Sequence, residues 1–252
     1  MSHSLRRLSA LILFFLACSQ PASFPGESLL HSSSQQVLVI VGTDRDSTGW
    51  LYRYAADGGR WAAVGEPIPV SVGAGGVAKE REGDKRAPSG AYPLPSVFGY
   101  AETPPGGLRM PYLALRPETE CVDDENSTFY NRVVNPSEVG GKSWSSSEMM
   151  RRDLNDHDDL YKLGLLVAYN PDGHRDGKTG KGAGSCIFLH IWRGPGRPTV
   201  GCTAMPEEGM MTLLTWLDPQ ARPILVQGSR EELEVLARDG KLPYSLPPKR
   251  LS

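Results

Sequence analysis

VLVIV (37–41), LYRY (51–54), WAAV (61–64) and IPVSV (68–72) are short apolar segments separated by turn residues near the start of the chain. The first and the last are rich in β-branched side chains, which favour strands. The middle two flank Asp57-Gly58-Gly59, a sequence typical of a β-hairpin turn. The opening part of the chain is therefore predicted to form a β-sheet.

Further strands and a few helices follow. Three later apolar runs predict buried strands: 163–169, 187–191 and 224–227. The capping-box sequence SSSE (145–148) predicts a short helix over the next residues. Pro206-Glu207-Glu208 predicts a helix through MMTLLTWL, and SREE (229–232) predicts a last helix that ends at Gly240. The predicted fold class is mainly β with a few helices (α+β).

The bulk composition indicates one packed domain. The chain has 252 residues, of which 39% are hydrophobic and 22% charged, so it can bury a core. The net charge is −2 with no long basic run, which argues against nucleic-acid binding. We assign 37–228 to the main domain, 20–36 to a linker rich in Ser, Pro and Gly, and 229–252 to a C-terminal helix and loose tail.

The N-terminus is typical of a secretory signal peptide over residues 1–19. Arg6 and Arg7 precede an apolar run at 8–17 that is short for a membrane span. Cys18 follows a small residue, as in a bacterial lipoprotein signal, and we favour its lipidation over ordinary cleavage near Ser19 or Ala22. We therefore expect an exported protein of the periplasm or cell envelope, with a membrane contact only through this lipid anchor.

Cys202 is the strongest candidate for a reactive group. The chain has four cysteines, and without Cys18 an odd number remains, which leaves at least one thiol unpaired. Cys202 ends a glycine-rich loop and precedes the predicted helix, so we expect the helix terminus to lower its pKa to roughly 3.5–7.5. The backbone N–H groups of Gly201 and Val200 are candidates for an oxyanion hole.

His190 is the candidate base, because it ends the predicted strand 187–191 just upstream of the cysteine loop. A Cys–His pair of this kind supports nucleophilic catalysis, with the imidazole as general base. The alternative is a structural one, in which His190 is a satisfied core side chain and Gly201-Cys202 is an ordinary turn.

Several segments together resemble the YkuD-type L,D-transpeptidase domain. They are residues 37–94 with SVGAGG (71–76) and APSGAY (87–92), then His190, then TVGC (199–202). Three further segments resemble a divergent branch of that family: ECVDD (120–124), WSSSE (144–148) and GSCIFLHIWR (184–193). The resemblance covers most of residues 35–228.

The resemblance implies a YkuD-like mixed β-sandwich or barrel in which the cysteine loop leads into a helix. It implies that Cys202 attacks a carbonyl of a peptidoglycan tetrapeptide stem, releases a terminal D-amino acid and passes the acyl group to an amine of a neighbouring stem. His190 matches the family's base, Thr199 the Ser/Thr of its motif and Gly201 the glycine before the nucleophile. No metal or cofactor is implied.

The sequence also departs from the family pattern. Val200 replaces a usual His, Ile191 replaces a usual Gly, and no Arg or Asn closely follows the cysteine. We hypothesise that Arg193 or Arg197 takes the place of that Arg in substrate binding. Asp123 is a candidate for orienting the base or binding the amine of a stem peptide.

The two remaining cysteines, Cys121 and Cys186, are hypothesised to form a structural disulfide that braces the strand carrying His190. The alternative is that both are small buried apolar residues. A zinc site from His157 and His174 is possible on residue types, but their spacing matches no zinc motif.

Three functions fit these observations. The first is a cysteine acyltransferase that acts on peptidoglycan stem peptides, in L,D-transpeptidation. The second is a hydrolase with the same site, an L,D-carboxypeptidase or amidase. The third is a non-catalytic envelope lipoprotein that binds wall peptides, in which case Cys202 would be disulfide-bonded or unreactive.

Overall fold

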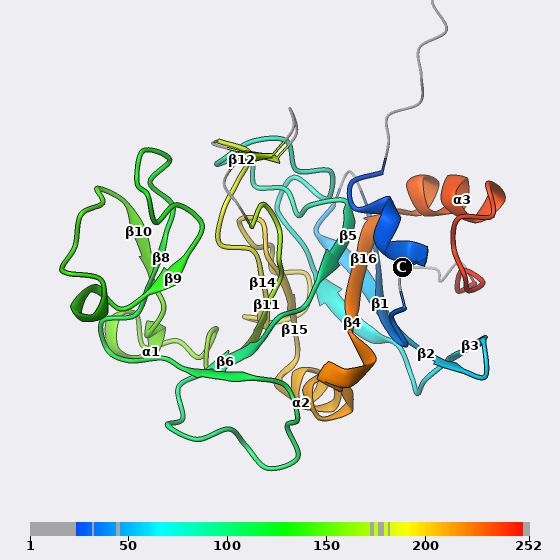
Figure 1. Cartoon of the computed structure of the whole chain (residues 1–252), viewed down its shortest axis with the longest axis horizontal. Coiled ribbons are helices and arrows are strands. Elements are labelled where there is room, and N and C mark those ends of the chain that lie inside the picture. Colours follow the sequence, from blue (N-terminus) through cyan, green and yellow to red (C-terminus); the bar gives the residue numbers. More distant parts are fainter. Residues whose placement is uncertain are drawn as a thin grey trace, which may run out of the picture.

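The structure is a computed structural model. It describes residues 24–31, 33–43, 46–171, 174–175, 179–180 and 182–248, with the backbone alone for residues 31, 174, 175, 179 and 180. The predicted signal peptide, Cys18 and the zinc candidate's His174 side chain therefore lie outside the described residues. Figure 1 shows a curled sheet, a smaller sheet at one end and α3 at the opposite end.

One mixed sheet of eleven strands forms most of the molecule. Its strands run in the spatial order β5 (Gly90–Pro93), β16 (Ile224–Ser229), β1 (Gln36–Gly42), β2 (Thr48–Asp57), β4 (Ile68–Ser71), β15 (Thr203–Met205), β14 (Phe188–Ile191), β11 (Leu163–Leu166), β6 (Val97–Gly99) and β7 (Tyr112–Ala114), with β3 (Arg60–Ala63) paired to β2. Three pairs are parallel: β1 with β16, β14 with β15, and β6 with β7.

A second sheet has three short strands in the order β10 (Ser147–Met149), β8 (Glu120–Val122) and β9 (Val133–Val134). A third is the two-stranded pair β12 (His174–Arg175) and β13 (Thr179–Gly180). The helices are α1 (Arg152–Asn155), α2 (Glu207–Trp216), α3 (Arg230–Arg238) and three 3-10 turns, η1 (Glu27–His31), η2 (Pro136–Glu138) and η3 (Pro219–Ala221). Among the described helices, none has the length and apolar character needed to cross a membrane.

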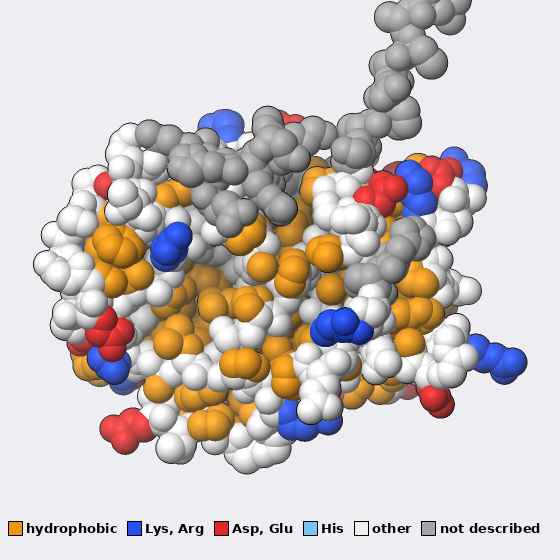
Figure 2. Space-filling view, in the orientation of Figure 1, with side chains coloured by type: hydrophobic (Ala, Val, Ile, Leu, Met, Phe, Trp, Pro, Cys, Tyr) orange, Lys and Arg blue, Asp and Glu red, His pale blue; other side chains and the backbone are white. Residues whose placement is uncertain are grey.

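Strand β1 is buried on both faces, which explains its uninterrupted apolar sequence. Leu38 and Ile40 enter the core cluster that also receives α2, whereas Val37 and Val39 enter a second cluster that receives α3. Helix α2 contributes Met210, Leu213 and Leu214 to the first cluster. Figure 2 shows hydrophobic side chains gathered across the middle of one face.

The main sequence predictions for the fold are confirmed. The predicted hairpin is the β2–β3 pair, in which Asp57 lies opposite Arg60 across the two glycines. The predicted capping box is present at Ser229, whose side chain accepts a hydrogen bond from the Glu232 N–H while Glu232 bonds back. The fold is mostly β with a few helices, as expected for the α+β class.

Two predictions about the chain ends are wrong for the residues that the structure describes. Phe24 and Leu30, from the predicted linker, are buried in the same cluster as β1. From the predicted loose tail, Tyr244 is 6% exposed and its ring stacks on Tyr54 at 4.8 Å. Burial of these large apolar side chains outweighs the loop-like composition around them.

The helix predicted after Ser145 is also wrong. Residues 147–149 are strand β10, which pairs with β8, and the short helix α1 begins only at Arg152. The Ser145 N–H and hydroxyl both bond the Asp124 carboxylate, each at 2.8 Å. The Ser145 groups that were expected to cap a helix therefore bind the carboxylate of Asp124, which follows β8.

Candidate active site

Cys202 immediately precedes β15, which lies beside β14. These strands are parallel, with Leu189 opposite Thr203 and His190 opposite Ala204. Cys202 packs with Phe188 in one apolar cluster, and Phe188 shares a face of β14 with His190 because side chains alternate along a strand. Leu189 points to the opposite face, into the core with α2. The packing around Phe188 thus brings the two candidate residues to one side of β14.

The Cys202 thiol is buried and held by two backbone groups. It donates a hydrogen bond to the Cys186 carbonyl and accepts one from the Phe188 N–H, both at 3.3 Å. Burial raises the pKa of Cys202 to about 12, and the charge of Glu148 adds to this rise. Strand β15 separates Cys202 from α2, so the helix terminus does not stabilise a thiolate. The prediction that the pKa of Cys202 is lowered is therefore wrong.

His190 is held as a neutral imidazole with a defined tautomer. Its Nδ1 lies 2.7 Å from the Ile191 carbonyl oxygen. A carbonyl only accepts, so Nδ1 carries the proton and Nε2 keeps its lone pair. Burial lowers the pKa of His190 to about 4. The ring is therefore uncharged at neutral pH and is able to accept a proton at Nε2.

Cys202 and His190 are not hydrogen-bonded to one another in the part of the chain that the structure describes. Tyr161 packs beside them, with its ring centroid 5.3 Å from that of His190, edge to face. Burial raises the pKa of Tyr161, and the nearby Glu148 and Cys202 side chains raise it further. Tyr161 therefore contacts His190 directly and lies near enough to Cys202 for the two side chains to influence each other's charge.

Glu148 is a site residue that the sequence analysis placed in a helix cap. Its Oε1 accepts a hydrogen bond from the Tyr161 hydroxyl at 2.7 Å. Burial raises the pKa of Glu148, whereas the Tyr161 hydrogen bond and the charge of Arg152 oppose this rise. The only sequence signal for this residue is the family-like segment WSSSE (144–148).

Lys79 approaches the cysteine loop from a buried position and was also missed. Its side chain is 2% exposed and its ammonium is 2.9 Å from Asp84. Gly184 and Gly201 have φ angles of +122° and +151°, and a Cβ on Gly184 would lie 2.0 Å from Lys79 Cε. Both positions require glycine for conformation, and the first also for space. The Lys79 charge acts to lower the pKa of Cys202, against burial.

Thr199 ties the cysteine loop together from within. Its hydroxyl donates to the Cys202 carbonyl at 2.6 Å and accepts from the Gly201 N–H at 3.2 Å. The Gly201 N–H is therefore engaged inside the loop in this state, and the Val200 side chain is 71% exposed. The Thr199 hydroxyl, a candidate for substrate binding, holds the loop in shape here.

The other substrate-binding candidates lie at different places. Arg193 is exposed and forms a 2.7 Å ion pair with Asp158, and its charge acts on His190. Arg197 is exposed in the loop that leads to Cys202. Asp123 follows β8, and its Oδ1 is buried without a hydrogen-bonding partner. Asp123 is near enough to Glu148 for its charge to act there.

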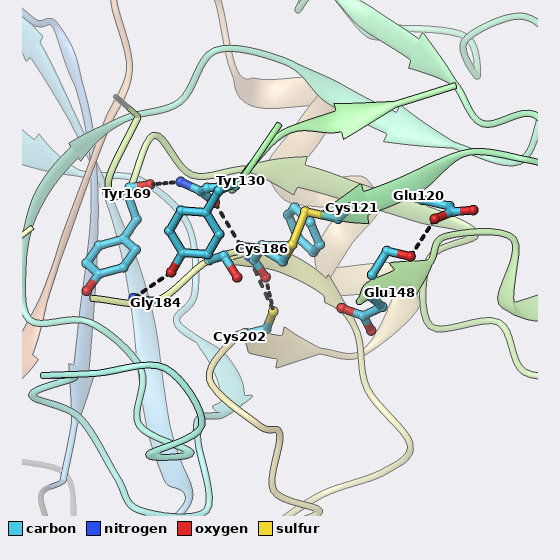
Figure 3. The surroundings of a disulfide bond; sticks show 12 residues. Glu120, Cys121, Tyr130, Glu148, Tyr169, Gly184, Cys186 and Cys202 are labelled. Carbon is cyan, nitrogen blue, oxygen red and sulfur yellow. Dashed lines mark hydrogen bonds between the residues drawn. A yellow bond between two sulfur atoms is a disulfide. The ribbon is translucent and has the colours of Figure 1, made fainter. Parts of the chain in front are cut away.

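A disulfide joins Cys121 of β8 to Cys186, just before β14, and leaves Cys202 as the free cysteine of the described residues. It ties the three-stranded sheet to the segment whose carbonyl holds the Cys202 thiol (Figure 3). The described residues contain no group of three His, Cys, Asp or Glu side chains arranged to bind a metal ion.

The family model for YkuD, the L,D-transpeptidase catalytic domain, matches residues 36–226. The chain belongs to the YkuD family. This is an L,D-transpeptidase-type family of peptidoglycan enzymes, whose members act on peptidoglycan peptides. The match spans both candidate strands and the disulfide, so the whole site lies within the YkuD domain.

Other comparisons add little. No curated protein matches the chain. A solved structure, that of Bdellovibrio bacteriovorus Bd1075, resembles it with a TM-score of 0.40 and 16% sequence identity. The resemblance covers 82% of this chain and 54% of the Bd1075 chain, so the chain spans about half the length of that structure's chain.

Proposed function

We propose that this YkuD protein is a cysteine acyltransferase that acts on peptidoglycan stem peptides, with Cys202 as nucleophile and His190 as general base. The observation that carries the proposal is that Cys202, just before β15, packs with Phe188, which lies on the same face of β14 as His190. The neutral His190 ring, with its lone pair at Nε2, supports the assignment of the base.

The proposed reaction begins with both groups neutral. The Cys202 thiol leaves its weak hydrogen bond to the Cys186 carbonyl and turns toward the stem peptide. As sulfur bonds to the substrate carbonyl carbon, the thiol proton passes to His190 Nε2. The C–N bond to the terminal D-amino acid then breaks, and the leaving amine takes the proton from His190.

A thioester on Cys202 remains after this step. An amine of a second stem would convert it to a cross-link, and water would convert it to a trimmed stem. We propose the amine as the acceptor, which makes the enzyme an L,D-transpeptidase; a carboxypeptidase is the alternative outcome. The chemistry at Cys202 and His190 is the same in both cases.

The test is incubation of purified stem tetrapeptides with the protein, read by mass spectrometry. The wild type should release a D-amino acid, and Cys202→Ala should lower this rate at least about 10³-fold, because it removes the nucleophile. Glu138→Gln is the matched control, since Glu138 is exposed and pairs with Arg116. A wild-type protein inert on every stem length would contradict the proposal, as would an active Cys202→Ala.

The proposal includes export to the envelope and lipidation of Cys18. It is supported by the basic Arg6 and Arg7 followed by the apolar run at 8–17. Cys18→Ala should move the protein from the membrane to the soluble fraction of a producing cell. An unchanged distribution would contradict lipidation, and a mature protein that still begins at Met1 would contradict signal cleavage.

A further inference from the structure

Glu148 belongs to the three-stranded sheet, which the disulfide ties to the segment that holds the proposed nucleophile. It lies on β10 directly opposite Cys121, whose disulfide partner Cys186 supplies the carbonyl that holds the Cys202 thiol. Its negative charge acts on Cys202. Figure 3 shows the Glu148 carboxylate and the Cys202 thiol on the same side of the disulfide. A carboxylate thus belongs to the surroundings of the atom that would carry the acyl group.

The two oxygens of Glu148 differ in what they contact. Oε1 accepts the Tyr161 hydroxyl at 2.7 Å, which fixes the orientation of the carboxylate. Oε2 has no hydrogen-bonding or ionic partner among the described residues. The side chain is 28% exposed. One oxygen is anchored, and the other has no partner among the described residues.

Among the described residues, this carboxylate has no basic side chain closer than Arg152. The nearest guanidinium, Arg152, is 3.8 Å from Oε1 and makes its shorter ion pair, 2.8 Å, with Asp156. The negative charges of Asp123 and Asp158 also act on Glu148. Asp123 Oδ1 is itself buried without a hydrogen-bonding partner. The chemical complement of this group is therefore a cation carrying N–H donors.

We propose that Glu148 receives the cationic amine that accepts the acyl group from Cys202. This inference rests on the proposed function, since it assumes a thioester at Cys202. It assigns the acceptor side of the site to the three-stranded sheet, and it makes an alkylammonium group, not water, the favoured acceptor. Tyr161 is the positioning residue that orients Glu148.

The proposed transfer step balances as follows. The acceptor ammonium binds Glu148 Oε2 and gives one proton to this carboxylate. The amine nitrogen then bonds to the thioester carbon, the C–S bond breaks, and the second surplus proton goes to the Cys202 sulfur. The products are a neutral amide, a neutral thiol and a protonated Glu148, which later loses its proton to water.

The experiment compares two acceptors with one donor stem peptide. One acceptor is a second stem peptide with a free amine, which is cationic at neutral pH; the other is hydroxylamine, which is uncharged there. Glu148→Gln should lower transfer to the cationic amine about 10-fold or more, because a hydrogen bond to a charged group is lost. Transfer to hydroxylamine, which carries no charge for Glu148 to bind, should stay within about 3-fold of wild type.

Glu138→Gln, which removes the same charge from an exposed position of this region, should leave both acceptors unaffected. If Glu148→Gln does not fold, Glu148→Asp replaces it, because this variant keeps the charge but withdraws it by one methylene. The inference is overturned if both acceptors fall together, if neither falls, or if the wild type only hydrolyses stems. A wild type that releases no D-amino acid overturns the proposed function itself.

Discussion

The eleven-stranded sheet and the three-stranded sheet are built in different ways. In the large sheet, β1 and β16 are buried on both faces and pair over six positions. In the small sheet, the strands have two or three residues, and such short strands are not stable alone. The small sheet relies on a disulfide and on polar contacts such as that between Glu120 and Trp144 at 2.7 Å.

The large sheet carries the residues of the proposed reaction, and the small sheet carries the residue proposed to select the acceptor. The large sheet carries His190 on β14 and holds Cys202 immediately before the neighbouring strand β15. The small sheet contributes Glu148 and Cys121, which lie opposite one another on its short strands β10 and β8. The large sheet can hold a nucleophile and a base in a fixed arrangement. The small sheet, joined to it by the disulfide, adds contacts beside them without changing that arrangement.

The largest expected effect on the reaction rate comes from His190, a residue of the large sheet. His190→Gln should lower the rate of D-amino acid release about 10²–10⁴-fold, because it removes the general base but leaves Cys202 in place. His157→Asn is the matched control, since His157 has a φ of +55°, which Asn tolerates. Product formation at saturating stem peptide measures both. A fully active His190→Gln protein would show that the base is another residue.

Removing the disulfide tests the link between the two sheets. The Cys121→Ala/Cys186→Ala protein should lose about 2–4 kcal/mol of unfolding free energy, because the bond closes a long loop across 65 residues of sequence. Denaturant titration measures this loss. Alkylation of Cys202 should also become faster, since the cluster of apolar side chains around it loosens. Unchanged stability would mean that packing alone holds the small sheet.

The pH dependence of stability tests the burial of His190. An unfolded His binds a proton below pH 6.5, whereas His190 in the folded protein does so only below about 4. Above pH 6.5 His190 is neutral in both states, and the fold keeps its full stability. As pH falls from 6.5 toward 4, only the unfolded chain binds the proton, so the free energy of unfolding decreases. The difference in unfolding free energy between wild type and His190→Gln should shrink over that window by something on the order of 3 kcal/mol. A constant difference would contradict the buried neutral ring.

The smallest expected effect comes from Ser229, the residue that caps helix α3. Ser229→Ala removes the capping hydrogen bond to the Glu232 N–H and should cost about 1 kcal/mol of stability. Thermal unfolding measures the change. Activity at a temperature where the variant is folded should equal that of wild type, and a loss of activity would indicate coupling between α3 and the site.

The sequence predicted the parts of the molecule that depend on local pattern. The strands near residues 37–41 and 187–191, the Asp57-Gly58-Gly59 hairpin and the Ser229 capping box all follow from periodicity or from capping chemistry between near neighbours. Cys202 and His190 were singled out from the family-like motifs, and the match over residues 36–226 shows the same family.

The sequence did not predict what depends on distant contacts. SSSE (145–148) has the pattern of a helix cap, but Asp124 uses the polar groups of Ser145 and β8 pairs with residues 147–149. The thiol of Cys202 was expected near a helix terminus, yet β15 lies between. Lys79 comes from far away in the sequence, and no local pattern marks its approach to Gly184.

The central claim is that Cys202 forms a covalent acyl-enzyme, and trapping that species tests it most directly. Wild-type protein is mixed with a stem tetrapeptide, quenched in acid and analysed by intact mass and peptide mapping. We predict a mass increase equal to the stem peptide minus its terminal D-amino acid, located on the peptide that contains Cys202. Release of D-amino acid without this adduct, or an adduct on any other residue, would contradict the account.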